Sequence, residues 1–183
     1  MAPLTARRRR TIVRAIIAAA ALMAGAPALA EPTDVAVKAA FLPRFARYVS
    51  WPSAAMPRGS DPFVLCVIGA DPFGGALDAA ARSQLIDGHR ITIRRLDSAG
   101  QSDGCHIAFV GVGRSQAALQ LIAALGRKPV LTVTDSAIGA QRGIIHFAVV
   151  AGHVRFFIDQ GAAAQRGLAV SSRLLALAIG VRP

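Results

Sequence analysis

The fold is decided by residues 63–73, which read Phe-Val-Leu-Cys-Val-Ile-Gly-Ala-Asp-Pro-Phe. The run from Phe63 to Ile68 is apolar and uncharged, which is typical of a strand buried on both faces of an α/β sheet. Gly69 ends the run. The Asp71 carboxylate can then accept hydrogen bonds from exposed N–H groups, and Pro72 suits the first position of a helix because it has no N–H to satisfy. These residues predict a βα unit at the centre of the fold.

Strands and helices alternate around this unit. Before it, apolar residues recur at helical spacing over residues 33–51, so we expect an amphipathic helix that is capped by Thr33 or Asp34 and kinked or broken at Pro43. After it, the patterns predict a helix over 72–82, strands over 90–96 and 105–110, a helix over 115–125 and a strand over 129–134. The order β-α-β-β-α-β implies an α/β fold, a mainly parallel sheet with helices on both faces.

The last third of the chain has a different pattern. Residues 143–150 and 153–158 alternate in polarity on either side of Ala151-Gly152, which predicts an antiparallel β-hairpin that adds edge strands to the sheet. Two terminal helices should follow, over 160–168 and 172–179. We expect the second to be capped by Ser171 and to dock inward through its leucines, Leu174, Leu175 and Leu177.

The first thirty residues have a character of their own. Arg7–Arg10 precede the apolar run Ile12–Met23, and Ala28-Leu29-Ala30 matches a small-x-small cleavage site. We predict a secretory signal peptide over residues 1–30, cleaved after Ala30, and one domain over residues 31–183. A membrane anchor is the alternative, but roughly 12 apolar residues are fewer than the ~20 that span a bilayer. We therefore expect export, with no membrane insertion after cleavage.

The charge of the chain is reduced once this segment is set aside. The whole chain has a formal net charge of +11, but five of its 21 basic residues and none of its ten acidic residues lie in residues 1–30. Residues 31–183 therefore carry a net charge of +6, and their adjacent Arg/Lys pairs are Arg94-Arg95 and Arg127-Lys128, far apart in the chain. Nucleic-acid binding calls for clustered basic residues with interleaved aromatics. Neither is present, so we expect no nucleic-acid partner.

The chain has two cysteines, Cys66 and Cys105, which are 39 residues apart. One lies within a predicted strand and the other begins one. If these strands are neighbours in an exported protein, a disulfide is geometrically reasonable, and two buried free thiols are the alternative. Without a C-x-x-C motif, such a bond would be a staple rather than a redox centre.

Metal-binding and catalytic patterns are absent from the sequence. The side chains able to ligate a metal do not show ligand spacing such as H-x-x-x-H. They are Cys66, Cys105, His89, His106, His146 and His153. We expect His146 to be a half-exposed sheet residue. No G-x-S-x-G motif is present, and Ser171-Ser172 is typical of a helix cap, so we expect no metal, no cofactor and no catalytic residue.

One turn could hold a ligand. Gly111-Val-Gly113-Arg114-Ser115 follows a predicted strand and opens a predicted helix, where free N–H groups together with Arg114 and Ser115 could bind an anion. A dinucleotide site is not indicated, because Gln116 occupies the third glycine position and Asp135 is poorly placed as the acidic partner. A plain strand–helix turn is the alternative to a ligand loop.

Several segments carry a family resemblance. They are Lys38-Ala-Ala-Phe-Leu with Phe45-Ala, Tyr48-Val and Trp51-Pro52; Leu65–Gly74; Cys105-His-Ile-Ala-Phe; Val130–Asp135; Val154–Asp159; Ala163–Leu168; and Ser171–Ala178. In this order they resemble the YfiR-like family of secreted bacterial proteins. The resemblance covers nearly all of residues 31–183.

The resemblance implies a binding protein rather than an enzyme. The best-understood member looks like a periplasmic repressor, which binds the periplasmic sensor domain of an inner-membrane diguanylate cyclase and holds the cyclase inactive. Its release raises cyclic di-GMP and promotes biofilm formation. For this chain the resemblance therefore implies a periplasmic location and such a sensor domain as partner, and we also expect a homodimer.

Three features depart from the family pattern. The best-known member has a second disulfide, which a chain with two cysteines cannot form beside the first, so redox control through that bond cannot apply. Asp159 stands where the family usually has Asn, and Pro43 stands where another residue continues the first helix.

We expect the docking surface to use the hairpin and the segment after it. The residues concerned are Arg155, Asp159, Ala163 and Arg166. The same residues could instead close the core. A function of another class is also open, namely a periplasmic small-ligand carrier or sensor that uses the turn over residues 111–115.

Overall fold

The computed structural model describes residues 33–112 and 115–183. The predicted signal peptide, residues 1–30, and Arg114 lie outside the described residues. Among the described residues, no helix is long and apolar enough to span a membrane.

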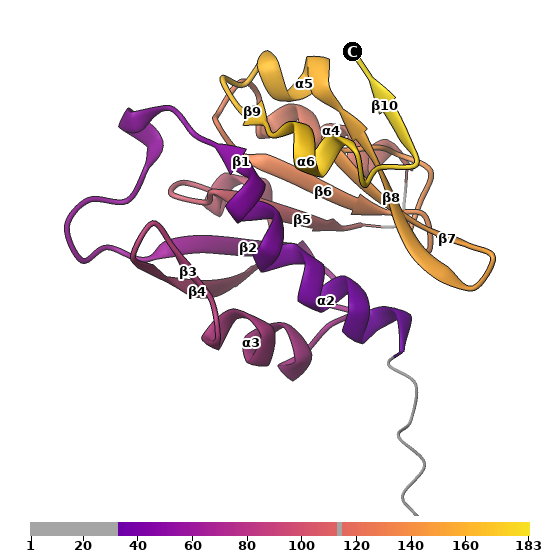
Figure 1. Cartoon of the computed structure of the whole chain (residues 1–183), viewed down its shortest axis with the longest axis horizontal. Coiled ribbons are helices and arrows are strands. Elements are labelled where there is room, and N and C mark those ends of the chain that lie inside the picture. The colour runs from indigo at the N-terminus through magenta and orange to yellow at the C-terminus, as the bar shows by residue number, and fades with distance from the viewer. Residues whose placement is uncertain (1–32, 113–114) are drawn as a thin grey trace, which may run out of the picture. The chain divides into compact units, whose positions relative to one another are not determined.

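In the described part of the chain, eight strands form one sheet in the order β10-β8-β7-β6-β5-β2-β4-β3 (Figure 1). Their bounds are β2 Phe63–Gly69, β3 Leu85–Ile86, β4 His89–Leu96, β5 Ile107–Gly111, β6 Leu131–Asp135, β7 Ile145–Val150, β8 His153–Asp159 and β10 Gly180–Arg182. The run β4-β2-β5-β6-β7 is parallel throughout, whereas β3 pairs antiparallel with β4, and β8 with β7. The predicted mainly parallel α/β fold with an antiparallel hairpin is confirmed.

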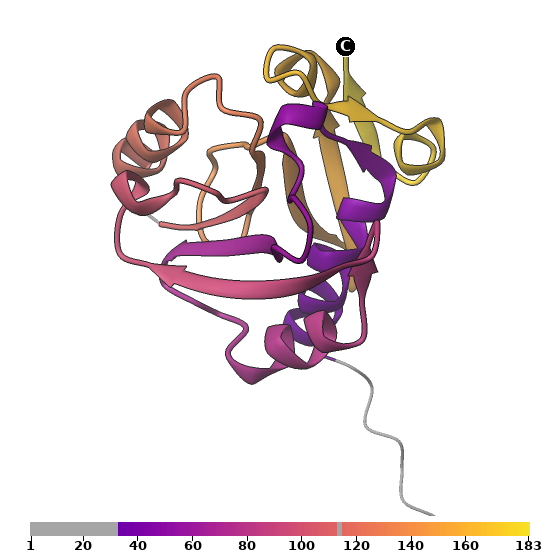
Figure 2. The same cartoon turned by 90° about the vertical axis from the view of Figure 1, so that its left-hand side faces the viewer.

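Helices cover both faces of this sheet. Their bounds are α2 Asp34–Phe45, α3 Gly75–Arg82, α4 Ser115–Ala124, α5 Gln160–Ala164 and α6 Ser172–Leu175. Figure 2 shows that the sheet is strongly curled: β2 and β4 run across the view, and β8 stands nearly upright beside α2. α2 and α3 pack on the face that carries the main core, which we call the inner face, while α4 packs on the outer face at β5.

The alternation of side chains in β2 supplies both cores. Phe63, Leu65 and Val67 point into the main cluster on the inner face, with Leu42 and Phe45 of α2. Cys66 and Ile68 point into a smaller cluster on the outer face, together with Ala108, Leu121 and Leu125. The residues of β2 from Leu65 to Ile68 are completely buried. A strand with both faces covered has no need of polar positions, which explains the uninterrupted apolar run.

The first helix does not break at proline. Thr33 Oγ1 accepts a hydrogen bond from Ala36 N–H at 3.2 Å, and α2 runs through Pro43 to Phe45 before a 3₁₀ turn at Ala46–Tyr48. The expected break is wrong, because α2 continues past Pro43 to Phe45 and the missing N–H of a proline in the last turn removes a single helical hydrogen bond. The chain then forms β1, Val49–Ser50, which pairs with β9, Ala169–Val170.

The second helix begins later than predicted. Asp71 Oδ1 does accept N–H groups, from Phe73 at 2.7 Å and from Gly74 at 3.2 Å, but these bonds close a turn rather than the first helical turn. Gly74 has φ +48°, outside the helical region, so α3 starts only at Gly75. The segment between α3 and β4, where no element was predicted, contains the short strand β3.

The C-terminal end differs most from the prediction. The hairpin is present, with Ala151 and Gly152 both at positive φ in its turn, but its strands are not at the sheet edge. β7 pairs with β6, and β8 is covered by β10, a strand where the sequence predicted none. The last helix, α6, ends at Leu175, so Leu174 is buried while Leu177, expected to dock inward, is 62% exposed.

Candidate functional site

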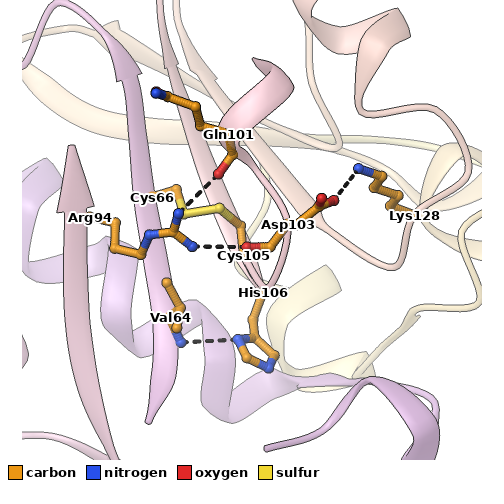
Figure 3. The surroundings of a disulfide bond; sticks show 8 residues. All are labelled: Val64, Cys66, Arg94, Gln101, Asp103, Cys105, His106 and Lys128. Atoms are coloured by element: carbon orange, nitrogen blue, oxygen red, sulfur yellow. Dashed lines mark hydrogen bonds and ion pairs between the residues drawn. A yellow bond between two sulfur atoms is a disulfide. The ribbon is translucent and has the colours of Figure 1, made fainter. Parts of the chain in front are cut away.

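Cys66 and Cys105 form a disulfide between neighbouring strands (Figure 3). Their Cα atoms are 5.8 Å apart, because Cys66 lies in the middle of β2 and Cys105 lies just before β5. Both residues are buried, at 0% and 6% exposure. Little of either cysteine is accessible to a reductant or a partner. In the chain-entropy model, a disulfide that closes a loop of this length stabilises the fold by about 4 kcal/mol.

The loop before Cys105 is held by side chains from elsewhere in the chain (Figure 3). Arg94 donates from its guanidinium to the carbonyl oxygens of Asp103 at 2.8 Å and Gln101 at 3.0 Å. Lys128 Nζ lies 2.6 Å from Asp103 Oδ1, and this contact lowers the pKa of the Asp103 carboxyl. These contacts hold the loop in place and account for the polar residues around the disulfide.

The histidine beside the disulfide has a structural role. His106 is 8% exposed, its Nδ1 accepts a hydrogen bond from Val64 N–H at 3.0 Å, and its ring stacks on Phe63 at 4.4 Å (Figure 3 shows the hydrogen bond). Burial lowers its pKa below the usual value. Among the described residues, no three His, Cys, Asp or Glu side chains converge as a metal site.

The carboxyl ends of β2 and β5, where α/β sheets commonly bind ligands, are in direct contact. Ala70 N–H donates to Gly111 O at 3.0 Å, and a Cβ on Gly111 would lie 1.9 Å from Ala70 O. No crevice remains between these two backbones. Ser115 begins α4, but its side chain and Arg114 lie outside what the structure describes, so the predicted ligand loop stays a prediction.

The outer face of β7, β8 and β10 carries polar and aromatic side chains. β8 alternates, with Phe156 and Ile158 buried in the main core and Arg155, Phe157 and Asp159 on the outer face. Arg155 is exposed and Phe157 is half-buried. We call these three residues, with Arg142 and Arg182, the hairpin face.

The structure separates the four residues predicted to bind a partner. Arg155 and Asp159 share the hairpin face, but Ala163 is 0% exposed in the core, so its predicted contact with a partner is wrong: the inner side of α5 packs it against the main cluster. Arg166 turns toward α4 and donates to Ile122 O at 3.4 Å; burial lowers the pKa of its guanidinium.

Asp159 has two contacts within the fold. Its Oδ1 accepts Ala162 N–H at 2.7 Å and so caps α5, and its Oδ2 lies 3.3 Å from Arg182 Nη1 on the edge strand. An Asn at this position could keep the cap but not the charge pairing with Arg182. Asp159, which stands where the family usually has Asn, therefore forms an ion pair between β8 and β10.

Three residues of the hairpin face were missed by sequence reasoning. The Arg142 guanidinium carbon lies 4.3 Å from the centroid of the Phe157 ring, a cation–π contact. The alternation of β8 could have placed Phe157 beside Arg155. The loop residue Arg142 and the terminal residue Arg182 reach the face only through tertiary structure.

A buried ion pair was also missed. Lys38 Nζ of α2 lies 2.8 Å from Asp135 Oδ2 at the end of β6, and both side chains are 5% exposed. Asp135 Oδ1 in addition accepts Ala137 N–H at 3.0 Å. The pair fixes α2 over the middle of the sheet, between the disulfide and the hairpin.

The chain belongs to the YfiR/HmsC-like family, whose model matches residues 35–179. No curated protein matches it. The family consists of periplasmic regulatory proteins rather than enzymes and is associated with the control of diguanylate cyclases. The disulfide fits that compartment, since such bonds persist in oxidising environments.

Proposed function

We propose that this protein is a periplasmic repressor that binds the periplasmic sensor domain of an inner-membrane diguanylate cyclase and holds the cyclase inactive. Family membership over residues 35–179 carries the proposal. Binding lowers cyclic di-GMP and biofilm formation, and release reverses both. Residues 1–30 would direct export, and N-terminal sequencing of the exported protein should begin at Glu31.

The hairpin face supplies a surface suited to this role. It presents Arg142, Arg155 and Arg182 against a single carboxylate, Asp159, which already contacts Arg182. Arginine is enriched among the residues that dominate the binding energy of protein interfaces, and phenylalanine, the residue at position 157, is enriched at interfaces in general. A net positive face calls for an acidic surface on the sensor domain.

A pull-down from detergent-solubilised inner membrane tests the proposal. The tagged, exported protein should recover a membrane protein that has a cytoplasmic cyclase domain. The variant Arg142→Glu/Arg155→Glu should lose this protein, and Arg58→Glu/Arg90→Glu, which changes as many exposed arginines elsewhere, should retain it. Recovery of no membrane protein by the folded, disulfide-bonded chain would contradict the repressor function, and recovery by the first variant would contradict the surface.

We also propose a homodimer. The C-terminal segment exposes apolar side chains at alternate positions, Leu177, Ile179 and Val181, along and just before the edge strand β10. A second copy would cover them. Light scattering across a concentration series should give twice the mass of residues 31–183, and a monomer mass at every concentration would contradict the dimer.

A further inference from the structure

The hairpin face is hollowed where β7, β8 and β10 meet the loop before β7. The hollow has a volume of ≈ 200 Å³. Its lining includes Arg142, His146, Phe157, Asp159, Gly180 and Arg182. Gly180 keeps the backbone of β10 close to the ring of Phe157, since a Cβ there would lie 2.9 Å from Phe157 Cδ1.

A buried imidazole contributes to this lining. His146 is 4% exposed, so the expectation of a half-exposed sheet residue is wrong, and burial lowers its pKa. Its Nδ1 lies 2.8 Å from Thr134 Oγ1. Its Nε2 has no hydrogen bond to a described residue, yet it is not among the completely enclosed polar atoms. His146 is one of the residues that line the hollow.

The hydrogen bonds of Thr134 favour one tautomer of His146. Thr134 Oγ1 accepts Gly143 N–H at 2.9 Å, and its own hydroxyl proton has two possible acceptors, His146 Nδ1 at 2.8 Å and Ile145 O at 3.4 Å. The shorter contact is the better hydrogen bond. In the tautomer in which Thr134 donates across this shorter contact, Nδ1 is the acceptor and the neutral ring carries its proton on Nε2.

The walls supply further donors. The Arg142 guanidinium lies against the Phe157 ring, and no described residue accepts from its N–H groups. Arg182 shares its charge with Asp159 at 3.3 Å, which neutralises the one carboxylate of the lining. The lining of the hollow thus combines an imidazole, which carries its proton on Nε2 in that tautomer, a planar guanidinium fork and an aromatic surface.

We propose that this hollow binds a small organic carboxylate, with the carboxylate on Arg142 and His146 Nε2 and the apolar part against Phe157. A planar carboxylate matches the fork of an arginine with two parallel hydrogen bonds. The site is independent of the proposed repressor function. Because it lies within the hairpin face, a bound carboxylate would also compete with a partner for Arg142.

Benzoate is the probe, titrated into the purified, exported protein and followed by calorimetry and thermal unfolding. We expect saturable binding and a rise in melting temperature, because a ligand that binds only the native state stabilises it. Arg142→Gln should weaken binding at least tenfold, and Phe157→Leu should weaken it less. The matched control, Arg58→Gln, should bind as the wild type does. Near-UV circular dichroism verifies that each variant is folded.

Two comparisons separate this site from general anion binding. Benzamide, which has the same ring without the charge, should not bind, and sulfate should not displace benzoate at equal concentration. Equal affinity for benzamide, displacement by sulfate, or unchanged affinity in folded Arg142→Gln would each overturn the proposal. Failure of the wild-type protein to bind benzoate would not change what the wild-type protein recovers in the membrane pull-down, so the two proposals can fail separately.

Discussion

The two halves of the sheet share one inner core but differ on the outer face. In β2 and β5 the outer-face residues Cys66, Ile68 and Ala108 are all 0% exposed, covered by the cluster that includes Leu121 and Leu125. In β8 the outer-face positions hold Arg155, which is exposed, and Phe157, which is half-buried. One half is closed on both faces and cross-linked, and the other is open on one face.

This difference separates stability from recognition. The closed half gains from burial on both faces and from the disulfide, and it has little left to offer a partner. The hairpin half keeps Phe147, Phe156 and Ile158 in the same inner core, so it stays anchored while its other face carries charge. A rigid strand with an uncovered face is a surface that can bind with little ordering cost.

Removal of the disulfide should cause the largest change. The double variant Cys66→Ala/Cys105→Ala should lose about 4 kcal/mol of the free energy of unfolding in urea, because the unfolded chain regains the entropy of the closed loop. At urea concentrations below its unfolding transition, the double variant should still recover the partner in a pull-down, because the hairpin face is not altered. A loss below about 1 kcal/mol would contradict the assignment of the disulfide as a staple.

The next largest effect should come from the buried ion pair Lys38–Asp135, which lies over the middle of the sheet. Lys38→Met leaves the Asp135 carboxylate buried without its cation, and we expect a loss of about 3 kcal/mol. Arg44→Met, on the exposed side of the same helix, is the matched control and should change stability by less than about 0.5 kcal/mol. Equal effects of the two variants would show that the pair contributes nothing.

Acid should destabilise both halves through their buried histidines. Burial lowers the pKa of His106 and of His146 below the ordinary value of 6.5, so the unfolded chain binds protons more readily than the folded chain. The stabilisation is complete above pH 6.5 and is lost as the pH falls from 6.5 through the lowered pKa values. Urea unfolding at pH 7.5 and pH 5 should show this loss.

Single substitutions show how much each histidine contributes to this pH dependence of the unfolding free energy. His106→Gln and His146→Gln should each reduce the difference in unfolding free energy between the two pH values. His153→Gln, at an exposed position, should leave it unchanged. A difference that persists in the double variant at positions 106 and 146 would contradict this origin.

A smaller effect is expected at the cap of α5. Asp159→Ala removes the acceptor for Ala162 N–H and should cost about 1 kcal/mol. Asp159→Asn keeps an acceptor and gives up only the contact with Arg182, whose side chain is 74% exposed, so it should lie close to the wild type in urea unfolding. A larger loss in the Asn variant than in the Ala variant would contradict the capping role.

The smallest effect on stability should come from the hairpin face itself. Arg155→Glu at an exposed position should change the unfolding free energy by less than about 0.5 kcal/mol. If the proposed surface is correct, the same variant should show reduced partner recovery. Strong destabilisation would mean that Arg155 supports the fold rather than a partner.

The parts of the fold that were predictable follow from local patterns. The uncharged run from Phe63 to Ile68 needs no tertiary information to indicate a doubly buried strand, and the alternation on either side of Ala151-Gly152 indicates a hairpin. The start of α3 was misplaced because Asp71 forms the same hydrogen bonds in a turn as in a helix cap, and only the positive φ of Gly74 separates the two.

The sequence by itself determined the βα core, the hairpin and the family, because periodicity and segment order are properties of the chain alone. The tertiary structure alone decided that Lys38 meets Asp135, that residues 180–182 extend the sheet, and that Arg142 and Arg182 line one hollow. These contacts join residues far apart in the chain. No local spacing encodes them, because each depends on where two backbones are brought together by the burial of other side chains.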